Sequence, residues 1–293
     1  MRRLLLAVAL LSSPVAAIAG CPPAGQSAAS LQRLKASGYD TPNTGRVALA
    51  MALVDCLGDP DPALRDGIAY EALAHWMRAG AFESGDLRGL RDRLLVQLDG
   101  DDPGGFRKPF AALVLAEVAR TDRIAPWMEP GERAAMVEAA ARYLESVRDY
   151  RGYDDNAGWR HGVAHGADWL MQLALNPALE RVQLDRILAA VAAQVMPDAG
   201  HAYVFGEPGR LSRPVRFVAA RSLHSGAEWK AWLDALSARL GAYPASGPRS
   251  GWLARRHDLT AFLSALHLEI EAAGAGPAGA LGPALDAVLH PAD

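Results

Sequence analysis

Apolar residues recur three or four positions apart along most of this chain, as they do on one face of an α-helix. Runs of β-branched and aromatic residues are few, so the pattern predicts no strand. Proline, glycine and capping residues mark the ends of the apolar runs. On this basis, helices are predicted at residues 27–37, 45–57, 59–79, 84–98, 106–120, 130–148, 159–175, 179–196, 208–223, 227–240 and 252–273.

The predicted helices follow one another in pairs about 40 to 50 residues apart, which is typical of helical-repeat solenoids. An all-α, HEAT-like solenoid is therefore the predicted fold. An α/α barrel is the main alternative, because no repeated sequence signature accompanies the spacing. A hydrophobic fraction of 51% is ample for the core of one large domain, which we place at residues 20–273. Residues 274–293 are predicted to form a Gly/Ala/Pro-rich tail with a weak last helix.

Residues 1–19 have the three parts of a secretory signal peptide. Arg2 and Arg3 come first, an apolar run follows at residues 4–11, and small residues lead to Ala19. We therefore expect an exported protein, periplasmic or secreted, and leave this segment out of the fold. The apolar run is too short to span a bilayer and no later stretch is long and uninterrupted enough, so no transmembrane segment is predicted.

The two cysteines, Cys21 and Cys56, allow two interpretations. Cleavage after Ala19 would leave an even pair that can close a disulfide in an oxidising compartment. Alternatively, residues 18–21 fit a bacterial lipobox, in which Cys21 would carry a lipid and anchor the protein in the envelope. The disulfide is favoured, because exported proteins seldom leave one thiol idle.

The charge of the chain narrows the range of partners. Without Arg2 and Arg3 there are 28 basic and 33 acidic residues, a net charge of −5. This acidity opposes binding to nucleic acid or to anionic lipid by charge alone. A peptide, a protein or a small molecule is the expected partner, and membrane contact is expected only through a lipid at Cys21.

The densest set of chemically versatile side chains lies at residues 149–168, which hold two arginines, two histidines, four aspartates and three aromatic residues. If a helix runs through the second half of this segment, His161, His165 and Asp168 fall on one stripe about 60° wide. Gln172 falls on the same stripe. The opposite, buried face would carry Trp159, Val163, Leu170 and Leu173.

Two glycines lie beside this stripe. Gly162 and Gly166 are four positions apart on the predicted helix, so they would share one side of it. Because they have no side chains, they would permit close approach of another helix.

The histidine stripe has competing interpretations. A His-x-x-x-His spacing followed by Asp168 could hold a divalent metal such as zinc and serve a metal-dependent hydrolase, with Asp154 or Asp155 as a nearby base. The signal is weaker than His-Glu-x-x-His, because no glutamate stands next to His161. Imidazoles that merely fix packing by bonding to a neighbouring helix are the commoner case, so no cofactor is expected. A peptide or small-molecule site without metal is the third interpretation.

Arg151, before Gly152, could clamp the carboxylate or phosphate of a ligand. Such an arginine more often pairs with a local aspartate such as Asp149, or ties a loop to a helix end. Residues 154–156 are interpreted as turn and N-cap residues of the helix that we expect to begin at Trp159.

Other candidates lie outside this segment. The set Arg65, Asp66, Tyr70 and Glu71 is interpreted as a charged, solvated helix face. The set His201, Tyr203, Glu207 and Arg210 could form the far wall of a groove. No nucleophile elbow, P-loop or dinucleotide fingerprint is present. The candidate ligand-binding residues are Asp149, Arg151, Tyr153, Trp159, His161, His165, Asp168, Glu207 and Arg210.

These motifs have a family resemblance. The string Asp149-x-Arg151-Gly152-Tyr153, continued by Gly158-Trp159-x-His161-x-x-Ala164-His165-x-x-Asp168, resembles the signature of the bacterial domain-of-unknown-function family 2785. Residues 59–66 and the string Glu207-x-x-Arg210-Leu211 also resemble blocks of that family, so the resemblance would cover about residues 31–240. It implies a helical, HEAT-like fold, and it implies no activity and no catalytic residue.

Three functional hypotheses follow. The leading one is an exported interaction module that binds a peptide, protein or small ligand in a groove floored by Arg151, Trp159, His161, His165 and Asp168. The second is the metal-dependent hydrolase. The third is a glycan-active α/α-barrel enzyme with Asp154 or Asp155 as its acid and Trp159 as a sugar platform. Whether the two imidazoles converge on space that solvent can reach separates the first hypothesis from the second.

Overall fold

The computed structural model describes residues 20–197, 200–273 and 279–290, so the predicted signal peptide at residues 1–19 lies outside the described residues. The all-α prediction is confirmed. The α-helices are α1 (Ala28–Ala36), α2 (Asn43–Leu53), α3 (Pro62–Leu64), α4 (Glu71–Arg78), α5 (Ser84–Val96), α6 (Arg107–Ile124), α7 (Pro130–Ser146), α8 (Gly162–Ala174), α9 (Arg181–Val195), α10 (Glu207–Ala219), α11 (Gly226–Ala238), α12 (Ser250–Ala273) and α13 (Leu281–Leu289).

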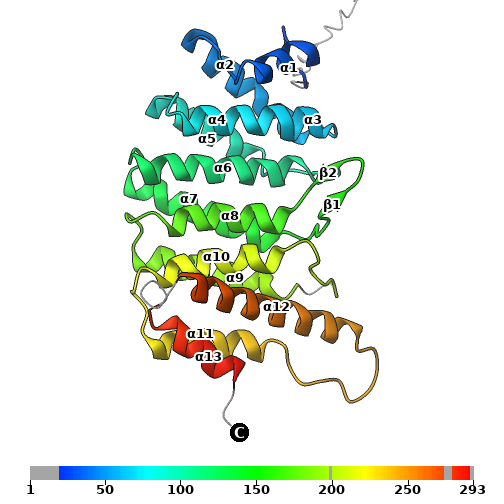
Figure 1. Ribbon diagram of the computed structural model, residues 1–293, viewed down its shortest axis with the longest axis vertical. Helices are drawn as coiled ribbons and strands as arrows, with labels where there is room; N and C mark the ends of the chain where they lie inside the picture. Colours follow the sequence, from blue (N-terminus) through cyan, green and yellow to red (C-terminus); the bar gives the residue numbers. More distant parts are fainter. Residues whose placement is uncertain (1–19, 198–199, 274–278, 291–293) are drawn as a thin grey trace, which may run out of the picture.

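The helices are stacked in layers along the longest axis of the molecule (Figure 1). One row runs through α4, α6, α8, α10 and α12, each in contact with the next. Behind it, α7 and α9 pack on one another and against α8 and α10. The helices α1 and α2 lie at one end of the stack and α13 lies at the other, where it packs on α11 and α12. Among the described residues, none of the helices combines the length and the apolar composition that a membrane span requires.

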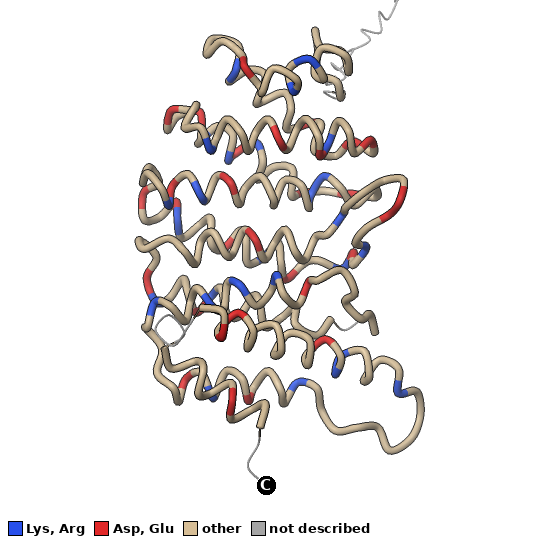
Figure 2. Tube along the Cα trace, viewed as in Figure 1, with Lys and Arg blue, Asp and Glu red and all other residues tan. Residues whose placement is uncertain are grey.

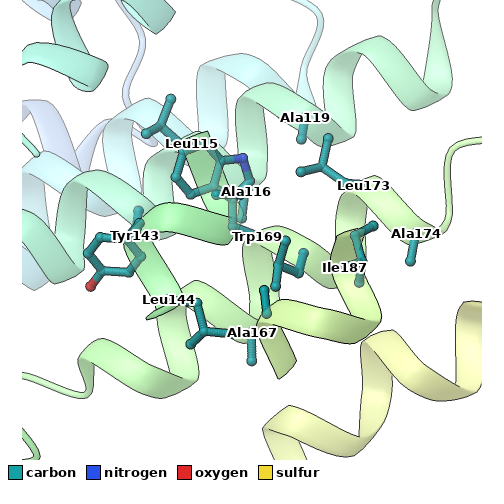
Figure 3. Packing of buried hydrophobic residues seen from close by; sticks show 14 of the residues in the cluster. Leu115, Ala116, Ala119, Tyr143, Leu144, Ala167, Trp169, Leu173, Ala174 and Ile187 are labelled. Atoms are coloured by element: carbon teal, nitrogen blue, oxygen red, sulfur yellow. The ribbon is translucent and has the colours of Figure 1, made fainter. Parts of the chain in front are cut away.

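The core continues from layer to layer. Near its centre, the fully buried Trp169 of α8 lies among Leu115 and Ala116 of α6, Leu144 of α7 and Leu173 of its own helix (Figure 3). Each buried leucine among them contributes about 1.5 to 3 kcal/mol through its removal from water. The packed central layers therefore hold the N-terminal end of α8, with His161 and His165, in a fixed position.

The close approach predicted at Gly162 and Gly166 is present. A Cβ atom at Gly166 would come within 3.1 Å of both Leu144 and Tyr143, and one at Gly162 would come within 3.4 Å of the Tyr143 hydroxyl oxygen. A Cβ atom at Gly166 would force the Leu144 and Tyr143 side chains to shift, whereas one at Gly162 would make ordinary van der Waals contact. Gly166 therefore permits the close packing of α8 on α7 at this point.

Charged side chains of both signs are interspersed along the stack in the view of Figure 2. Several of them join one layer to the next. Arg186 of α9, for example, bonds to Glu138 at 2.8 Å and to Glu145 at 2.6 Å, both on α7. These pairs are half-exposed and each adds at most about 1 kcal/mol, so they orient layers more than they stabilise them.

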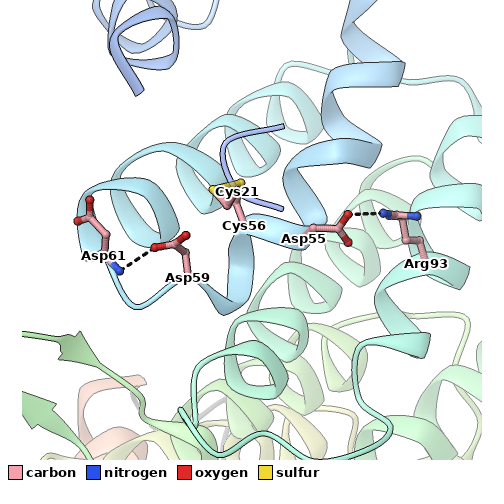
Figure 4. The surroundings of a disulfide bond; sticks show 6 residues. All are labelled: Cys21, Asp55, Cys56, Asp59, Asp61 and Arg93. Carbon is pink, nitrogen blue, oxygen red and sulfur yellow. Dashed lines mark hydrogen bonds and ion pairs between the residues drawn. A yellow bond between two sulfur atoms is a disulfide. The ribbon is translucent and has the colours of Figure 1, made fainter. Parts of the chain in front are cut away.

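A disulfide joins Cys21 to Cys56, with the two Cα atoms 5.0 Å apart (Figure 4). It ties the segment before α1 to the buried 3₁₀ helix η1 (Val54–Gly58). A loop of this length stabilises the folded chain by about 3 to 4 kcal/mol on the chain-entropy estimate. A sulfur atom in a disulfide is not available for lipid attachment, so the structure does not support the lipobox interpretation.

The helix predicted at residues 59–79 is interrupted. Asp61 caps its start and Pro62 is its first residue, as expected, and Asp61 accepts a hydrogen bond from the backbone N–H of Ala63 at 2.8 Å. After α3, however, the backbone winds into the π-helix η2 (Arg65–Tyr70) before α4 begins. The apolar pattern does not distinguish i→i+5 from i→i+4 bonding, so this change was not foreseen.

Two further predictions fail at the segment before α8. The strands β1 (Tyr153–Asp154) and β2 (Gly158–Trp159) pair as a small antiparallel hairpin where no strand was predicted. The helix itself begins at Gly162 rather than at Trp159, and its N-cap is His161 rather than a residue of 154–156. The hairpin arises because the turn at residues 154–157 reverses the chain before the helix can start.

Candidate functional site

A cleft of about 560 Å³ opens along the row from α4 to α10. Its volume is within the usual range of small-ligand sites. Four successive layers line it: η2 with the start of α4, then α6, then the hairpin with the start of α8, and finally α10 with the loop before it. The lining residues are Asp66, Tyr70, Glu71, Phe110, Leu113, Trp159, His161, His165, Phe205, Gly206, Gly209, Arg210 and Arg213.

The first wall of the cleft depends on Arg65, whose side chain is fully buried. Its guanidinium donates to the backbone carbonyls of Asp59 at 2.9 Å and Ala157 at 2.7 Å, and its Nε lies 2.6 Å from Oδ1 of Asp66. The guanidinium also lies 4.0 Å from the ring centroid of Phe106. Arg65 thereby joins the π-helix to the tip of the hairpin.

The prediction of a charged, solvated face at Arg65, Asp66, Tyr70 and Glu71 is therefore wrong for Arg65, whereas Glu71 is exposed as predicted. Arg65 is buried, and the other three residues line the cleft. The π-helix turns Asp66 and Tyr70 toward α6 and the hairpin. Such π segments occur frequently at functional sites.

Aromatic side chains form the second wall. Trp159 stacks on His161 with ring centroids 4.6 Å apart, and the Phe205 ring lies 5.9 Å from the Trp159 ring. Tyr153 lies 5.1 Å from Trp159 but does not line this cleft. Trp159 is 37% exposed, so its predicted place on the buried face of α8 is wrong, whereas Val163, Leu170 and Leu173 of that face are buried. The reason is that Trp159 lies in β2, outside the helical periodicity.

Phe205 is held in this wall by a glycine. A Cβ atom at Gly152 would collide with the Phe205 ring. The missing side chain therefore lets the hairpin and the loop before α10 pack directly on one another.

His161 lies at the floor of the cleft, in the left-handed backbone conformation with φ 56° and ψ 40°. This conformation is uncommon for a residue other than glycine and costs free energy. The side chain is only 7% exposed, and its Nε2 lies 3.7 Å from Oε1 of Glu207. Burial, and then the positive charge of Arg210, lower the pKa of His161 to about 4. The imidazole is therefore neutral at physiological pH.

His165 follows one turn later on α8 and is 6% exposed. Its Nδ1 lies 3.1 Å from the carbonyl oxygen of Pro109, so Nδ1 carries the hydrogen and Nε2 is left as an acceptor. Burial, and then the neighbouring His161, lower the pKa of His165 to about 3. The cleft thus receives a second neutral imidazole, packed edge-on against Phe110 with ring centroids 5.3 Å apart.

Asp168 lies behind the cleft and forms an ion pair with Arg210. Its Oδ1 is buried and has no hydrogen-bond partner among the described residues. Burial raises the pKa of Asp168, although Arg210 acts in the opposite direction. Within residues 20–197, 200–273 and 279–290, no group of three or more His, Cys, Asp or Glu side chains is placed to hold a metal ion. The histidine stripe is therefore not gathered into a metal-ligand set.

Glu207 supports the site from behind. It is the first residue of α10, is buried, and accepts a hydrogen bond from the backbone N–H of Phe205 at 2.9 Å. Of the four residues predicted for a far wall, Arg210 lines the cleft and Glu207 lies behind His161. The other two do not line this cleft. Tyr203 donates its hydroxyl hydrogen to the carbonyl of Gln194 at 3.0 Å, and His201 stacks on Tyr150 and lines a separate hollow.

The remaining candidates lie outside the cleft. Asp149 and Arg151 form an ion pair with each other, as expected of a local pair. Arg151, Tyr153 and Asp154 line a separate and more open hollow of about 630 Å³. Asp154 accepts hydrogen bonds from the backbone N–H groups of residues 156 and 157, so its predicted role in a turn is confirmed.

Comparison with known proteins identifies the family. The chain matches the family described as "Protein of unknown function (DUF2785)" over residues 94–268, which is more than half of its length. It belongs to that family. The match begins and ends later than the predicted residues 31–240, so the block at residues 59–66 lies outside it. Neither the curated proteins nor the solved structures gave a match.

Several cleft residues have no part in the motifs that the sequence shows. Phe205, Gly206, Gly209 and Arg213 surround the start of α10, and Phe110 and Leu113 lie on α6. The four around α10 adjoin Glu207 and Arg210, so the Glu-Pro-Gly-Arg start of that helix was the available signal. The two on α6 had none, because their apolar side chains fit the core pattern of their helix.

Proposed function

We propose that this is an exported binding protein whose cleft, centred on His161 and His165, takes a peptide or another small ligand. The observation that carries the proposal is the pair of neutral imidazoles that line an open cleft. With pKa values of about 4 and about 3, they are poor general bases at neutral pH. Nε2 of the neutral His165 can accept a hydrogen bond from a ligand, so the chemistry favours recognition over proton transfer.

The metal-dependent hydrolase is the less well supported function. Its carboxylate ligand would be Asp168, which is engaged by Arg210. The glycan-active enzyme has less support still, because neither Asp154 nor Asp155 lines the cleft.

Gly209 offers a direct test of the binding site. It is the third residue of α10, it lines the cleft, and a Cβ atom added to it meets nothing within 4 Å. Gly209→Phe is therefore expected to fill the cleft without disturbing the fold. Gly131→Phe is the matched control, because Gly131 lies in the first turn of α7, has equally open surroundings and does not line this cleft.

The measurement is equilibrium dialysis against the low-mass fraction of a bacterial periplasmic extract, with retained compounds identified by mass spectrometry. The unchanged protein and Gly131→Phe are expected to retain the same compounds, and Gly209→Phe is expected to retain them at least about tenfold less, a loss of roughly 1.4 kcal/mol. Equal retention by all three proteins would contradict the proposal. Stoichiometric zinc in protein purified without a histidine tag would favour the hydrolase instead.

Export is the second part of the proposal, and it is supported by the signal-peptide pattern at residues 1–19 together with the disulfide. The intact mass of periplasmic protein is expected to correspond to a chain that begins at Gly20 and is lighter than the reduced chain by two hydrogen atoms, one disulfide. Palmitate labelling together with retention in the membrane fraction would favour the lipid-anchored form.

A further inference from the structure

We infer that the ligand of this cleft is a peptide whose carboxyl terminus is held by Arg210 and Arg213 of α10. The inference rests on the proposed binding function and goes one step beyond it, because it names the chemical class of the ligand and its direction in the cleft. Four features of the cleft support it: its two guanidinium groups, its free acceptor, its apolar wall and its acidic end.

The guanidinium groups lie three positions apart on one face of α10, and both line the cleft. The Arg210 side chain is about one-third exposed and uses Nη1 to bind Asp168. Arg213 lies 3.7 Å from Glu269, whose carboxylate is closer to Arg216 at 3.2 Å. Because a guanidinium has five N–H donors, both arginines keep donors that can face the cleft, and a carboxylate is the group such donors match best.

The acceptor is Nε2 of His165, which is available because Nδ1 donates to the Pro109 carbonyl. A ligand that fits must therefore present an N–H or O–H donor close to its carboxylate. The backbone N–H groups of the last residues of a peptide meet this requirement.

The apolar wall decides between a peptide and an acidic sugar. Phe110, Leu113 and Phe205 offer a surface for an apolar side chain. A sugar would need a free aromatic face, whereas one face of Trp159 is covered by His161 at a centroid distance of 4.6 Å and Tyr153 lies 5.1 Å away. The wall therefore favours an apolar peptide side chain over a sugar ring.

The opposite end of the cleft carries Asp66 and Glu71. Asp66 is paired with Arg65 and Glu71 with Lys35, so neither cation is open to a second negative charge of a ligand such as a nucleotide. A single carboxylate is therefore the better fit for α10. Because the cleft is open to solvent and has a volume of about 560 Å³, it would hold a short terminal segment while the rest of a longer peptide extends outward.

The test uses two peptide mixtures that differ only at the carboxyl terminus. Both are N-acetylated tetrapeptides with alanine at the first two positions and all residues at the last two, and one mixture is amidated. Equilibrium dialysis followed by mass spectrometry is expected to show at least about tenfold greater retention of the free acids. Arg213→Gln is expected to reduce retention of the acids by about tenfold and to leave retention of the amides unchanged.

Arg216→Gln is the matched control. Arg216 lies on the same helix and contacts the same Glu269, but it does not line the cleft, so its loss is expected to leave the preference for acids intact. Equal retention of acids and amides, retention of neither, or selective retention of galacturonic acid trimers offered in parallel would each overturn the inference. The proposed binding function would fail separately, in the comparison of Gly209→Phe with Gly131→Phe.

Discussion

Two buried aspartates, Asp122 on α6 and Asp168 on α8, show how differently this stack treats the same side chain. Asp122 accepts hydrogen bonds from the backbone N–H groups of Trp127 and Met128, from Arg133 and from Asn176, all between 2.7 and 3.0 Å. Asp168 bonds to Arg210 through Oδ2, and its Oδ1 has no hydrogen-bond partner among the described residues.

The pKa shifts of the two carboxyls have opposite directions. Burial raises the pKa of Asp122, but Arg133 and the two backbone amides outweigh it, and the net pKa is lowered. For Asp168 burial outweighs Arg210, and the net pKa is raised. A carboxylate with all its bonds made is a structural element, whereas one with an unused buried oxygen is typical of a functional site.

The helices that carry the arginine partners of these aspartates, Arg133 on α7 and Arg210 on α10, also begin differently. Both α7 and α10 begin around the tripeptide Glu-Pro-Gly. In α7, Glu129 is an exposed N-cap within a capping box. In α10, Gly206 with φ 87° is the N-cap, and Glu207 is pulled inside against His161. The glutamate is the N-cap of α7 but the first helical residue of α10. This shift by one position places Glu207 beside the cleft instead of in a cap.

The largest expected effect is a loss of stability when either aspartate is replaced by alanine. Asp122→Ala is expected to lower the free energy of unfolding by about 3 to 5 kcal/mol, because it leaves Arg133, the Asn176 amide and two backbone amides without their acceptor. Asp168→Ala is expected to cost clearly less, since Arg210 can turn toward solvent. Urea denaturation of both variants measures the difference, and equal losses would remove the distinction between them.

The second effect is the dependence of stability on pH near the cleft. The pKa values of His161 and His165 are lowered to about 4 and about 3 in the folded protein, so their contribution to stability is complete above their unfolded value of about 6.5. As the pH falls from 7 to 5, the unfolded chain binds protons that the folded chain does not. Stability should then fall by about 2 kcal/mol for each histidine.

The measurement is the free energy of unfolding at pH 7 and pH 5. His165→Asn is expected to reduce the fall in stability, and the exposed His75→Asn is expected to leave it unchanged. A fall of the same size in all three proteins would mean that the cleft imidazoles are not held neutral.

The smallest expected effect comes from replacing each aspartate with asparagine, which removes the negative charge. Asp168→Asn keeps the shape of the side chain, and the loss of the ion pair to Arg210 is offset by relief of a buried charge. The free energy of unfolding at pH 7 is therefore expected to change by less than about 1 kcal/mol. Asp122→Asn, measured beside it, is expected to lose more, because an amide cannot accept bonds on both of its heteroatoms.

The apolar spacing predicted the all-α fold, and the buried positions of Val163, Leu170 and Leu173 followed from it. The pattern could not predict the left-handed backbone at His161 or the π-helix, because both depend on bonds to distant parts of the chain. Arg65 illustrates this, since its partner Ala157 lies 92 positions away. A helical wheel treats such a residue as part of an isolated cylinder, and it therefore placed Arg65 in water.

The bond from Arg65 to Ala157 also bears on what counts as the smallest working unit of this protein. The region shared with the family is residues 94–268, yet Asp66, Tyr70 and the arginine that anchors the hairpin precede it. A fragment cut at the family boundaries would retain the imidazoles and α10 but would have lost one side of the cleft. Binding by such a fragment would therefore differ from binding by the longer chain, even though the fragment holds every residue of the central motif.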